Sequence, residues 1–231
     1  MEKNWKLLAF DADDTLWDCQ SHFDEVEKKY ADILKPYGDG KKVSEELFKT
    51  ESGNMELLGY GCKAFTISLV ENAVKMSNGK IPADDILKIT ELGKSLLQLD
   101  GKPLNEVRET LKSIRQMDKY SMVVFTKGEL LDQENKMKRS GLTDLFDDVI
   151  VVSDKTKESY RKLCTRFDTD IKDFMMIGNS FKSDIEPVLK LGGWAVHIPF
   201  HTIWQHEKIE EYDHQKLFRI AHFGELTEIL K

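Results

Sequence analysis

The chain has 231 residues, of which 40% are hydrophobic and 32% are charged. This composition is typical of a folded protein with one large domain, or with a core and an inserted subdomain. The formal net charge of −7 at pH 7 argues against a nucleic-acid partner, which requires a basic face. A small anionic substrate can still bind at a local positive site.

The three cysteines, Cys19, Cys62 and Cys164, form no CxxC pair, so they indicate neither a disulfide framework nor a zinc site. The apolar run WKLLAF near the N-terminus is too short for a signal peptide. No later segment has the length of a membrane span. We therefore expect reduced thiols, no membrane partner and a cytoplasmic location.

The first predicted strand covers Trp5–Phe10, and three carboxylates follow within four positions in the stretch FDADDTLW. Like charges this close repel one another, and Asp is disfavoured in strands. Folding alone gives no reason to gather Asp11, Asp13 and Asp14 here. We therefore expect a positive group to share their site.

Residues 18–103 show helical patterns throughout, with glycine-rich turns between the helices. A block of this size is within the range of a domain, and it falls between the first and second predicted strands. We therefore predict that residues 18–103 form an inserted all-helical subdomain, on a core made of residues 1–17 and 104–231.

Strands and helices alternate in the second part of the core. The predicted strands are near-continuously apolar, as expected for strands covered on both faces, and they are Ser121–Thr126, Val149–Val152, Phe174–Ile177 and Trp194–Ile198. The helices predicted between them are Glu129–Ser140, Lys157–Arg166 and Ser183–Leu191. This alternation predicts an α/β fold with a doubly wound, Rossmann-like parallel sheet.

Polar side chains follow four of the predicted strands, at the edge where a doubly wound sheet binds its ligands. In strand order they are Asp11, Asp13, Asp14 and Thr15; Thr126 and Lys127; Lys155 and Lys157; and Asn179, Ser180, Ser183 and Asp184. Mg²⁺ commonly binds one or two carboxylates together with a substrate phosphate, and hydroxyl and ammonium groups can hold that phosphate. The sequence therefore predicts a site for a phosphate and a hard cation.

The order and spacing of these residues resemble the haloacid dehalogenase-like superfamily of hydrolases. Its first motif, DxDxT, corresponds to Asp11–Thr15, its second to Thr126, and its fourth, a GDxxxxD-like run, to Gly178–Asp184. Its third motif, a lysine, corresponds best to Lys155, with Lys157 as the alternative. The resemblance covers essentially the whole chain, because the insertion after the first motif looks like that superfamily's helical cap.

The resemblance implies a Mg²⁺-dependent phosphatase that acts on a small phosphorylated metabolite. Asp11 would attack phosphorus and form an aspartyl-phosphate. Asp13 would protonate the leaving oxygen and later deprotonate the attacking water. The implied metal ligands are Asp11, Asp13 through its backbone carbonyl, Asn179 and Asp184, and the implied phosphate-binding residues are Thr126, Lys127 and Lys155.

Asp13 separates the branches of the superfamily, whose dehalogenases and ion pumps lack an acid at this position. Its presence favours a phosphoric monoester hydrolase, and a phosphomutase of the same superfamily is the alternative. A catalytically weak binding protein that retains the fold is the alternative from another class, and only Asn179 favours it.

Two residues depart from the superfamily pattern. Asn179 stands where the fourth motif usually has its first acid, so the site has one negative charge fewer. Lys127 follows Thr126 where a neutral residue is more usual, and it either adds a positive charge to the pocket or points to solvent. The sequence specifies neither the particular substrate nor the oligomeric state.

Overall fold

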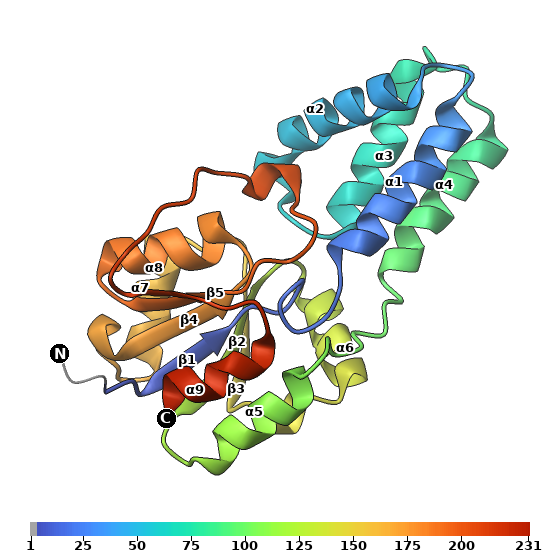
Figure 1. Ribbon diagram of the computed structural model, residues 1–231. Coiled ribbons are helices and arrows are strands. Elements are labelled where there is room, and N and C mark those ends of the chain that lie inside the picture. Colours follow the sequence, from blue (N-terminus) through green and yellow to red (C-terminus); the bar gives the residue numbers. More distant parts are fainter. Residues whose placement is uncertain (1–3) are drawn as a thin grey trace. The chain divides into compact units, whose positions relative to one another are not determined.

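The computed structural model describes residues 4–231, and the chain folds into two compact units. One unit runs to Gln20 and resumes at Gly101–Lys231, and the other comprises Ser21–Asp100 (Figure 1). The insertion predicted from the sequence, residues 18–103, differs from the second unit by three residues at each end (18 against 21, and 103 against 100).

The first unit is built on a parallel sheet with the strand order β3-β2-β1-β4-β5-β6, which confirms the doubly wound α/β fold. Its strands are β1 (Leu7–Phe10), β2 (Ser121–Lys127), β3 (Asp148–Val152), β4 (Phe174–Gly178), β5 (Trp194–His197) and β6 (Leu217–Arg219). Leu7 of β1 pairs with Ser121 of β2 on one side and with Phe174 of β4 on the other. The carboxyl ends of these three strands therefore lie together at one edge.

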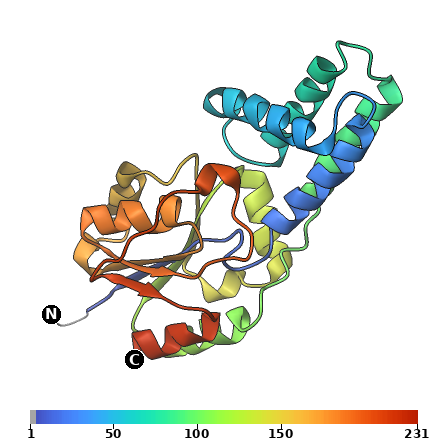
Figure 2. The same ribbon diagram turned by 45° about the horizontal axis from the view of Figure 1, so that its top comes forward.

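Helices cover both faces of this sheet (Figures 1 and 2). Those on one face are α5 (Val107–Gln116), α6 (Leu130–Ser140) and α9 (Leu226–Leu230), and those on the other are α7 (Lys157–Arg166) and α8 (Glu186–Leu191). Successive side chains of β1 enter opposite cores, with Leu8 and Phe10 in the first and Leu7 and Ala9 in the second. This two-sided burial explains why the strand is continuously apolar.

The helix predicted over Ser183–Leu191 begins differently from the prediction. A π-helical turn, Phe181–Ile185, leads into α8, and the Ser180 hydroxyl accepts a hydrogen bond from the Ser183 N–H at 3.0 Å. The turn brings Asp184 against Gly178, where an added Cβ would lie 2.2 Å from Asp184 Oδ2. Only glycine at the end of β4 therefore leaves room for this carboxylate.

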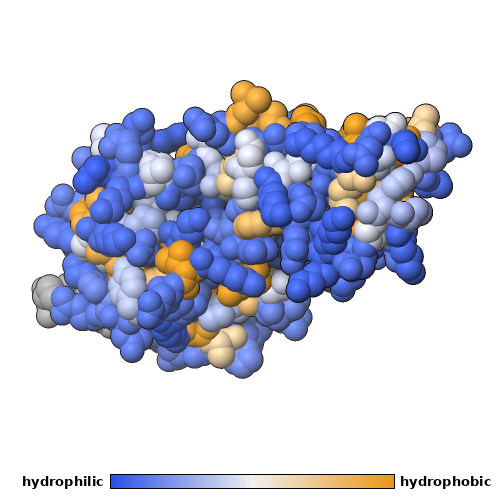
Figure 3. All heavy atoms as spheres, turned by 90° about the horizontal axis from the view of Figure 1, so that it is seen from above, coloured by the Kyte–Doolittle hydropathy of each residue, from blue (hydrophilic) through white to orange (hydrophobic). Residues whose placement is uncertain are grey.

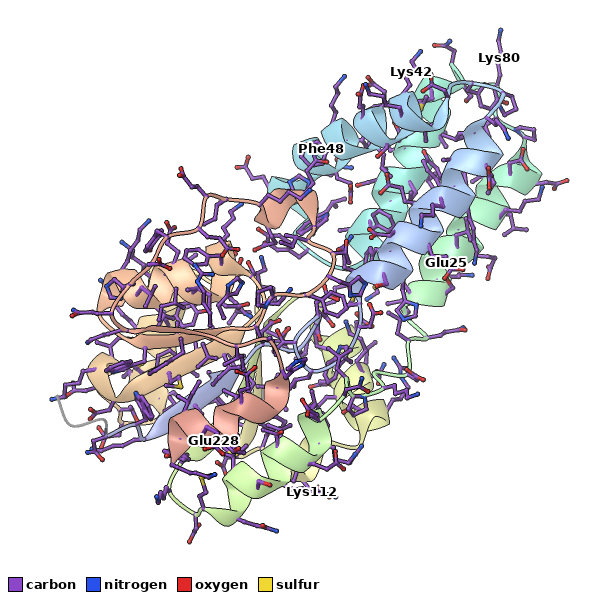
Figure 4. The ribbon with its side chains drawn as sticks, viewed as in Figure 1. Glu25, Lys42, Phe48, Lys80, Lys112 and Glu228 are labelled. Atoms are coloured by element: carbon purple, nitrogen blue, oxygen red, sulfur yellow. The ribbon has the colours of Figure 1, made fainter. Side chains whose placement is uncertain are left out.

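The second unit consists of helices with a core of its own: α1 (Gln20–Leu34), α2 (Gly40–Leu58), α3 (Cys62–Met76) and α4 (Ala83–Leu96). Tyr30 is fully buried in this core. An added Cβ on Gly93 would lie 2.0 Å from Thr66 Oγ1, so α3 and α4 approach closely at that glycine. Glu25 and Lys42 are exposed on the outer faces of their helices (Figure 4).

The surface is dominated by polar and charged groups. The face in Figure 3 is mostly hydrophilic, with small, separate apolar patches. Within residues 4–231, no helix is both long enough and apolar enough to cross a lipid bilayer.

Candidate active site

Asp11, Lys155 and Asp184 form a buried ionic cluster at the carboxyl edge of the sheet. Asp11 follows β1, Lys155 comes from the loop after β3, and Asp184 lies in the π-helical turn after β4. The Lys155 ammonium donates to Asp11 Oδ1, and to Asp184 Oδ1 at 2.6 Å. All three residues are buried, whereas Lys157 is exposed at the start of α7. Lys155 is therefore the lysine that contacts the two carboxylates.

The cluster lacks one positive charge, because two buried carboxylates share one ammonium group. Burial raises the pKa of Asp11 to about 7, although the nearby Lys155 lowers it. Burial also raises the pKa of Asp184. Burial would lower the pKa of Lys155, but the two carboxylates outweigh it and raise that pKa. A further cation beside Asp11 and Asp184 would favour the ionised form of both.

Thr15 joins this cluster to the loop after β4. Its hydroxyl lies 3.1 Å from Asp11 Oδ2 and 3.1 Å from Asn179 Oδ1, and it accepts from the Asn179 N–H at 3.1 Å. The buried His197 of β5 donates from Nε2 to the Asn179 carbonyl at 3.0 Å. Thr15 and His197 thus hold Asn179 beside the carboxylate of Asp11.

These oxygens are a donor set for a hard cation. Asp11 and Asp184 supply carboxylates and Asn179 supplies an amide oxygen, with the backbone carbonyl of Asp13 as the remaining predicted ligand. In the part of the chain that is described, no group of three or more His, Cys, Asp or Glu side chains is arranged to hold a metal. The set proposed here contains only two acidic side chains. Their unbalanced negative charge fits a divalent cation.

Asp13 lies in a second cluster, formed with α6. Its Oδ1 accepts from Trp17 Nε1 at 2.7 Å and from Lys136 Nζ at 2.8 Å. Its Oδ2 accepts from Gln133 Nε2 at 2.7 Å and from Lys136 Nζ at 2.9 Å. Burial would raise the pKa of Asp13, but Lys136, Gln133 and Trp17 outweigh it and lower that pKa. Four hydrogen bonds therefore favour the carboxylate form of this side chain, and a proton that binds to it during a reaction must displace one of these donors.

Lys136 is itself buried, and its ammonium also lies 3.3 Å from Asp132 Oδ2. Burial would lower the pKa of Lys136, but the neighbouring acidic groups, Asp13 first, outweigh it and raise that pKa. Sequence reasoning missed both Lys136 and Gln133. The available signal was their spacing, because residues 133, 136, 137 and 140 of the predicted helix Glu129–Ser140 lie on one face, and all four are buried.

The end of β2 supplies Thr126 and Lys127. The buried Thr126 hydroxyl lies 3.3 Å from the Lys127 carbonyl. The Lys127 side chain is 15% exposed, so it does not point to solvent, and its ammonium donates to Glu207 Oε1 at 2.6 Å and to Ser183 Oγ at 2.9 Å. Phosphate binding by Thr126 and Lys127 stays a prediction.

Glu207 belongs to the long loop after β5, in the short 3₁₀ turn Gln205–Glu207. Its Oε2 accepts from Ser183 Oγ at 2.6 Å and from Ser180 Oγ. Burial would raise its pKa, but Lys127 and the two serines outweigh it and lower the pKa of Glu207 to about 2. No sequence pattern indicated Glu207, because its partners lie at the end of β2 and after β4, and none of them is near it in the chain.

Asp14, the third acid of the FDADDTLW stretch, has a structural role. Its φ is 63°, in the left-handed region that Asp tolerates better than most residues. Its Oδ1 accepts from the N–H groups of Cys19 and Gln20, each at 2.8 Å, where α1 begins. Asp14 thus satisfies backbone donors at a helix start.

The model of the haloacid dehalogenase-like hydrolases matches residues 5–192, and the chain belongs to this family. It is similar to a haloacid dehalogenase-like family hydrolase from Xanthomonas campestris, a crystal structure with 33% sequence identity and a TM-score of 0.89 over 98% of this chain and 91% of that one.

Two more distant structures share the fold. One is a predicted phosphoglycolate phosphatase from Haemophilus somnus, with 17% identity and a TM-score of 0.64 over 99% of each chain. The other is a 2-haloacid dehalogenase from Pseudomonas syringae pv. Tomato, with 19% identity and a TM-score of 0.64 over 98% of each chain. No curated protein matches the chain in sequence. The family is thus established, and these two structures show the shared fold alone.

Proposed function

We propose that this protein is a Mg²⁺-dependent phosphatase that hydrolyses a small phosphate monoester through an aspartyl-phosphate. The observation that carries the proposal is the presence of two differently held carboxylates after β1. Asp11 lies against Lys155 among oxygen ligands, as a nucleophile for phosphorus requires. Asp13 is held apart from it by α6 and serves as acid and base.

In the first step, a carboxylate oxygen of Asp11 attacks phosphorus and the bond from phosphorus to the ester oxygen breaks. Protonated Asp13 donates its proton to that leaving oxygen. In the second step, Asp13 takes a proton from a water that attacks phosphorus. The bond from phosphorus to Asp11 then breaks, which releases inorganic phosphate and restores Asp11. Lys155 and Thr126 bind the phosphoryl oxygens throughout.

Mg²⁺ would be held by the side chains of Asp11, Asn179 and Asp184 and by the backbone carbonyl of Asp13. When bound, it would neutralise negative charge on the phosphoryl oxygens. Its charge also complements the two buried carboxylates that otherwise share Lys155 alone.

The acid at Asp13 favours a phosphate ester over a haloacid. A halide leaves as a stable anion and needs no proton, whereas an alkoxide leaving from phosphorus does. A haloacid dehalogenase has no use for a carboxyl group held by four hydrogen bonds two residues beyond its nucleophile.

The test measures phosphate release from 4-nitrophenyl phosphate and chloride release from 2-chloropropionate, each with Mg²⁺ and with EDTA. We expect Mg²⁺-dependent phosphate release that Asp11→Asn abolishes, and no chloride release. Asp84→Asn, at an exposed position at the start of α4, is the matched control and should behave as the wild type. Chloride release without phosphate release would overturn the proposal.

A cytoplasmic location forms part of the same proposal. The thiols of Cys19, Cys62 and Cys164 are buried, and within residues 4–231 none of the three forms a disulfide, which suits a reducing compartment.

A further inference from the structure

Lys136 is a buried lysine to which the reaction as described assigns no role. Its side chain is 1% exposed, and its ammonium lies between the carboxylates of Asp13 and Asp132. Burying an ammonium group is costly unless it is paired, and replacing a buried ion pair by apolar residues is often neutral or stabilising. Stability is therefore a weak reason for a lysine at this position.

The clearest effect of Lys136 is to fix one orientation of the Asp13 carboxylate. Lys136 contacts both oxygens, Trp17 contacts Oδ1 and Gln133 contacts Oδ2. A carboxylate offers about four acceptor positions. Donors from the segment after β1 and from helix α6 occupy all of them. A short side chain held at both oxygens from two sides cannot rotate freely.

Gln133 connects this carboxylate to the end of β2 through hydrogen bonds. Its Nε2 also donates to the Lys127 carbonyl at 3.0 Å. Both partners of Nε2 are acceptors, so the hydrogen bonds determine the amide orientation. Helix α6 thereby sets the place of Asp13 relative to the strand end that carries Thr126.

We propose that Lys136 is a positioning residue for the acid–base carboxyl group of Asp13, with Gln133 as a neutral second donor. The inference rests on the proposed phosphatase function, and it concerns the first step, in which the proton of Asp13 passes to the ester oxygen as the bond to phosphorus breaks. Lys136 acts through Asp13 and needs no contact with substrate or metal. A misplaced Asp13 slows only those esters whose leaving oxygen requires the proton.

The experiment compares two esters, a simple alkyl phosphate and 4-nitrophenyl phosphate. The 4-nitrophenolate ion leaves without protonation, and an alkoxide does not. The ratio kcat/KM reports the steps through phosphorylation of Asp11. For Lys136→Met we expect kcat/KM to fall about 10- to 100-fold on the alkyl ester and less than about threefold on the aryl ester. The matched control is Lys138→Met, at an exposed position on the same helix, and it should leave both values unchanged.

Two further variants separate positioning from folding. Lys136→Met leaves Asp13 and Asp132 without their shared cation and can cost stability. Gln133→Met removes a donor but no charge, and it should show the same ester selectivity with a smaller loss, about three- to tenfold on the alkyl ester. In an Asp13→Asn background, Lys136→Met should add less than about twofold, because no proton remains to be placed.

An equal loss on both esters in the two single variants would show that Lys136 only supports the fold. A full additional loss in the Asp13→Asn background would overturn the inference in the same way. A wild-type protein that releases phosphate from neither ester would instead overturn the proposed function, and the inference with it.

Discussion

Two buried lysines in this protein each lie between two aspartates. One aspartate of each pair, Asp11 and Asp13, has a shifted pKa, and the two shifts have opposite directions. Lys155 contacts Asp11, whose pKa burial raises to about 7. Lys136 contacts Asp13, whose pKa is lowered because its donors outweigh burial. A buried lysine alone therefore does not determine whether the pKa of the carboxyl group beside it is raised or lowered.

The difference lies in the neighbouring charges and donors, because the Asp184 carboxylate also raises the pKa of Asp11, whereas Lys136, Gln133 and Trp17 all lower the pKa of Asp13. The Asp11 side chain is 10% exposed, and Thr15 is its other hydrogen-bond partner at 3.1 Å. The Asp13 side chain is 27% exposed and accepts four hydrogen bonds. The carboxylate of Asp11 thus has fewer donors than that of Asp13, and a further cation would offset more of its charge. Four experiments test this comparison.

The largest effect is expected from Asp11→Asn, which removes the carboxylate that we propose as the nucleophile. Phosphatase activity should fall by more than about 10³-fold, as measured by initial rates with 4-nitrophenyl phosphate. The melting temperature above about pH 7 should stay constant or rise, because ionising a carboxyl group whose pKa is raised to about 7 costs stability there. Turnover within about tenfold of the wild type would contradict the nucleophile role.

Glu207 and Lys127 form a third lysine–carboxylate pair, whose pKa shift can be compared with those of Asp11 and Asp13. Its pKa in the folded chain is about 2, against an ordinary value of 4.5. The lowered pKa means that the pair stabilises the fold above about pH 4.5 and loses this effect as the pH falls toward about 2. Glu207→Gln should therefore destabilise the protein by about 2–3 kcal/mol near neutral pH, and by almost nothing at the acid end.

Thermal unfolding followed across this pH range measures the effect. Glu228→Gln, at an exposed position on α9 (Figure 4), is the matched control and should change stability by less than about 0.5 kcal/mol. A Glu207→Gln curve parallel to that of the wild type at every pH would mean that the pair contributes nothing.

Much of the fold could be predicted from apolar runs and strand–helix alternation. Helix α7 has the predicted bounds, Lys157–Arg166, and β2 to β5 lie within one residue of theirs at each end. Strand β6 was missed because it has only three residues and pairs with β5 alone. Helix α5 was missed although Val107, Leu111 and Ile114 have helical spacing and are buried.

The predicted site residues Asp11, Lys155 and Asp184 lie together because parallel strands bring their carboxyl ends to one edge. Lys136 and Glu207 could not be found by that rule. Lys136 comes from the side of a helix, and Glu207 comes from a loop after β5. Strand order predicts which loops meet at the edge of the sheet, but not which side chains of distant segments reach the same edge.

A smaller effect is expected on Mg²⁺ binding as the pH changes. Because the pKa of Asp11 without a metal is about 7, a cation must displace a proton from it at lower pH. The Mg²⁺ concentration for half-maximal activity should stay constant above about pH 8 and rise by up to about tenfold between about pH 7 and pH 6. Direct Mg²⁺ titration by calorimetry at the two pH values checks this without turnover, and equal constants would show that Asp11 does not bind the metal.

The smallest effect is expected from Asn179→Asp, which adds a carboxylate to the nucleophile site. The Asn179 amide oxygen shares the Thr15 hydroxyl with Asp11, so the new charge would stand close to Asp11 and Asp184 with Lys155 as their shared cation. A third carboxylate holds a divalent cation more tightly, but it repels the incoming phosphate in the same partly dry pocket.

We therefore expect Asn179→Asp to lower the Mg²⁺ concentration for half-maximal activity and to raise KM for the phosphate ester, each by about two- to fivefold. Thr15 can still donate to a carboxylate oxygen at position 179, so the local hydrogen bond survives and the change acts through charge. Separate titrations of Mg²⁺ and of substrate on the two proteins measure both constants. If each constant moves by less than about twofold, which is below about 0.5 kcal/mol, Asn179 does not ligate the metal, and Asp184 alone represents the fourth motif there.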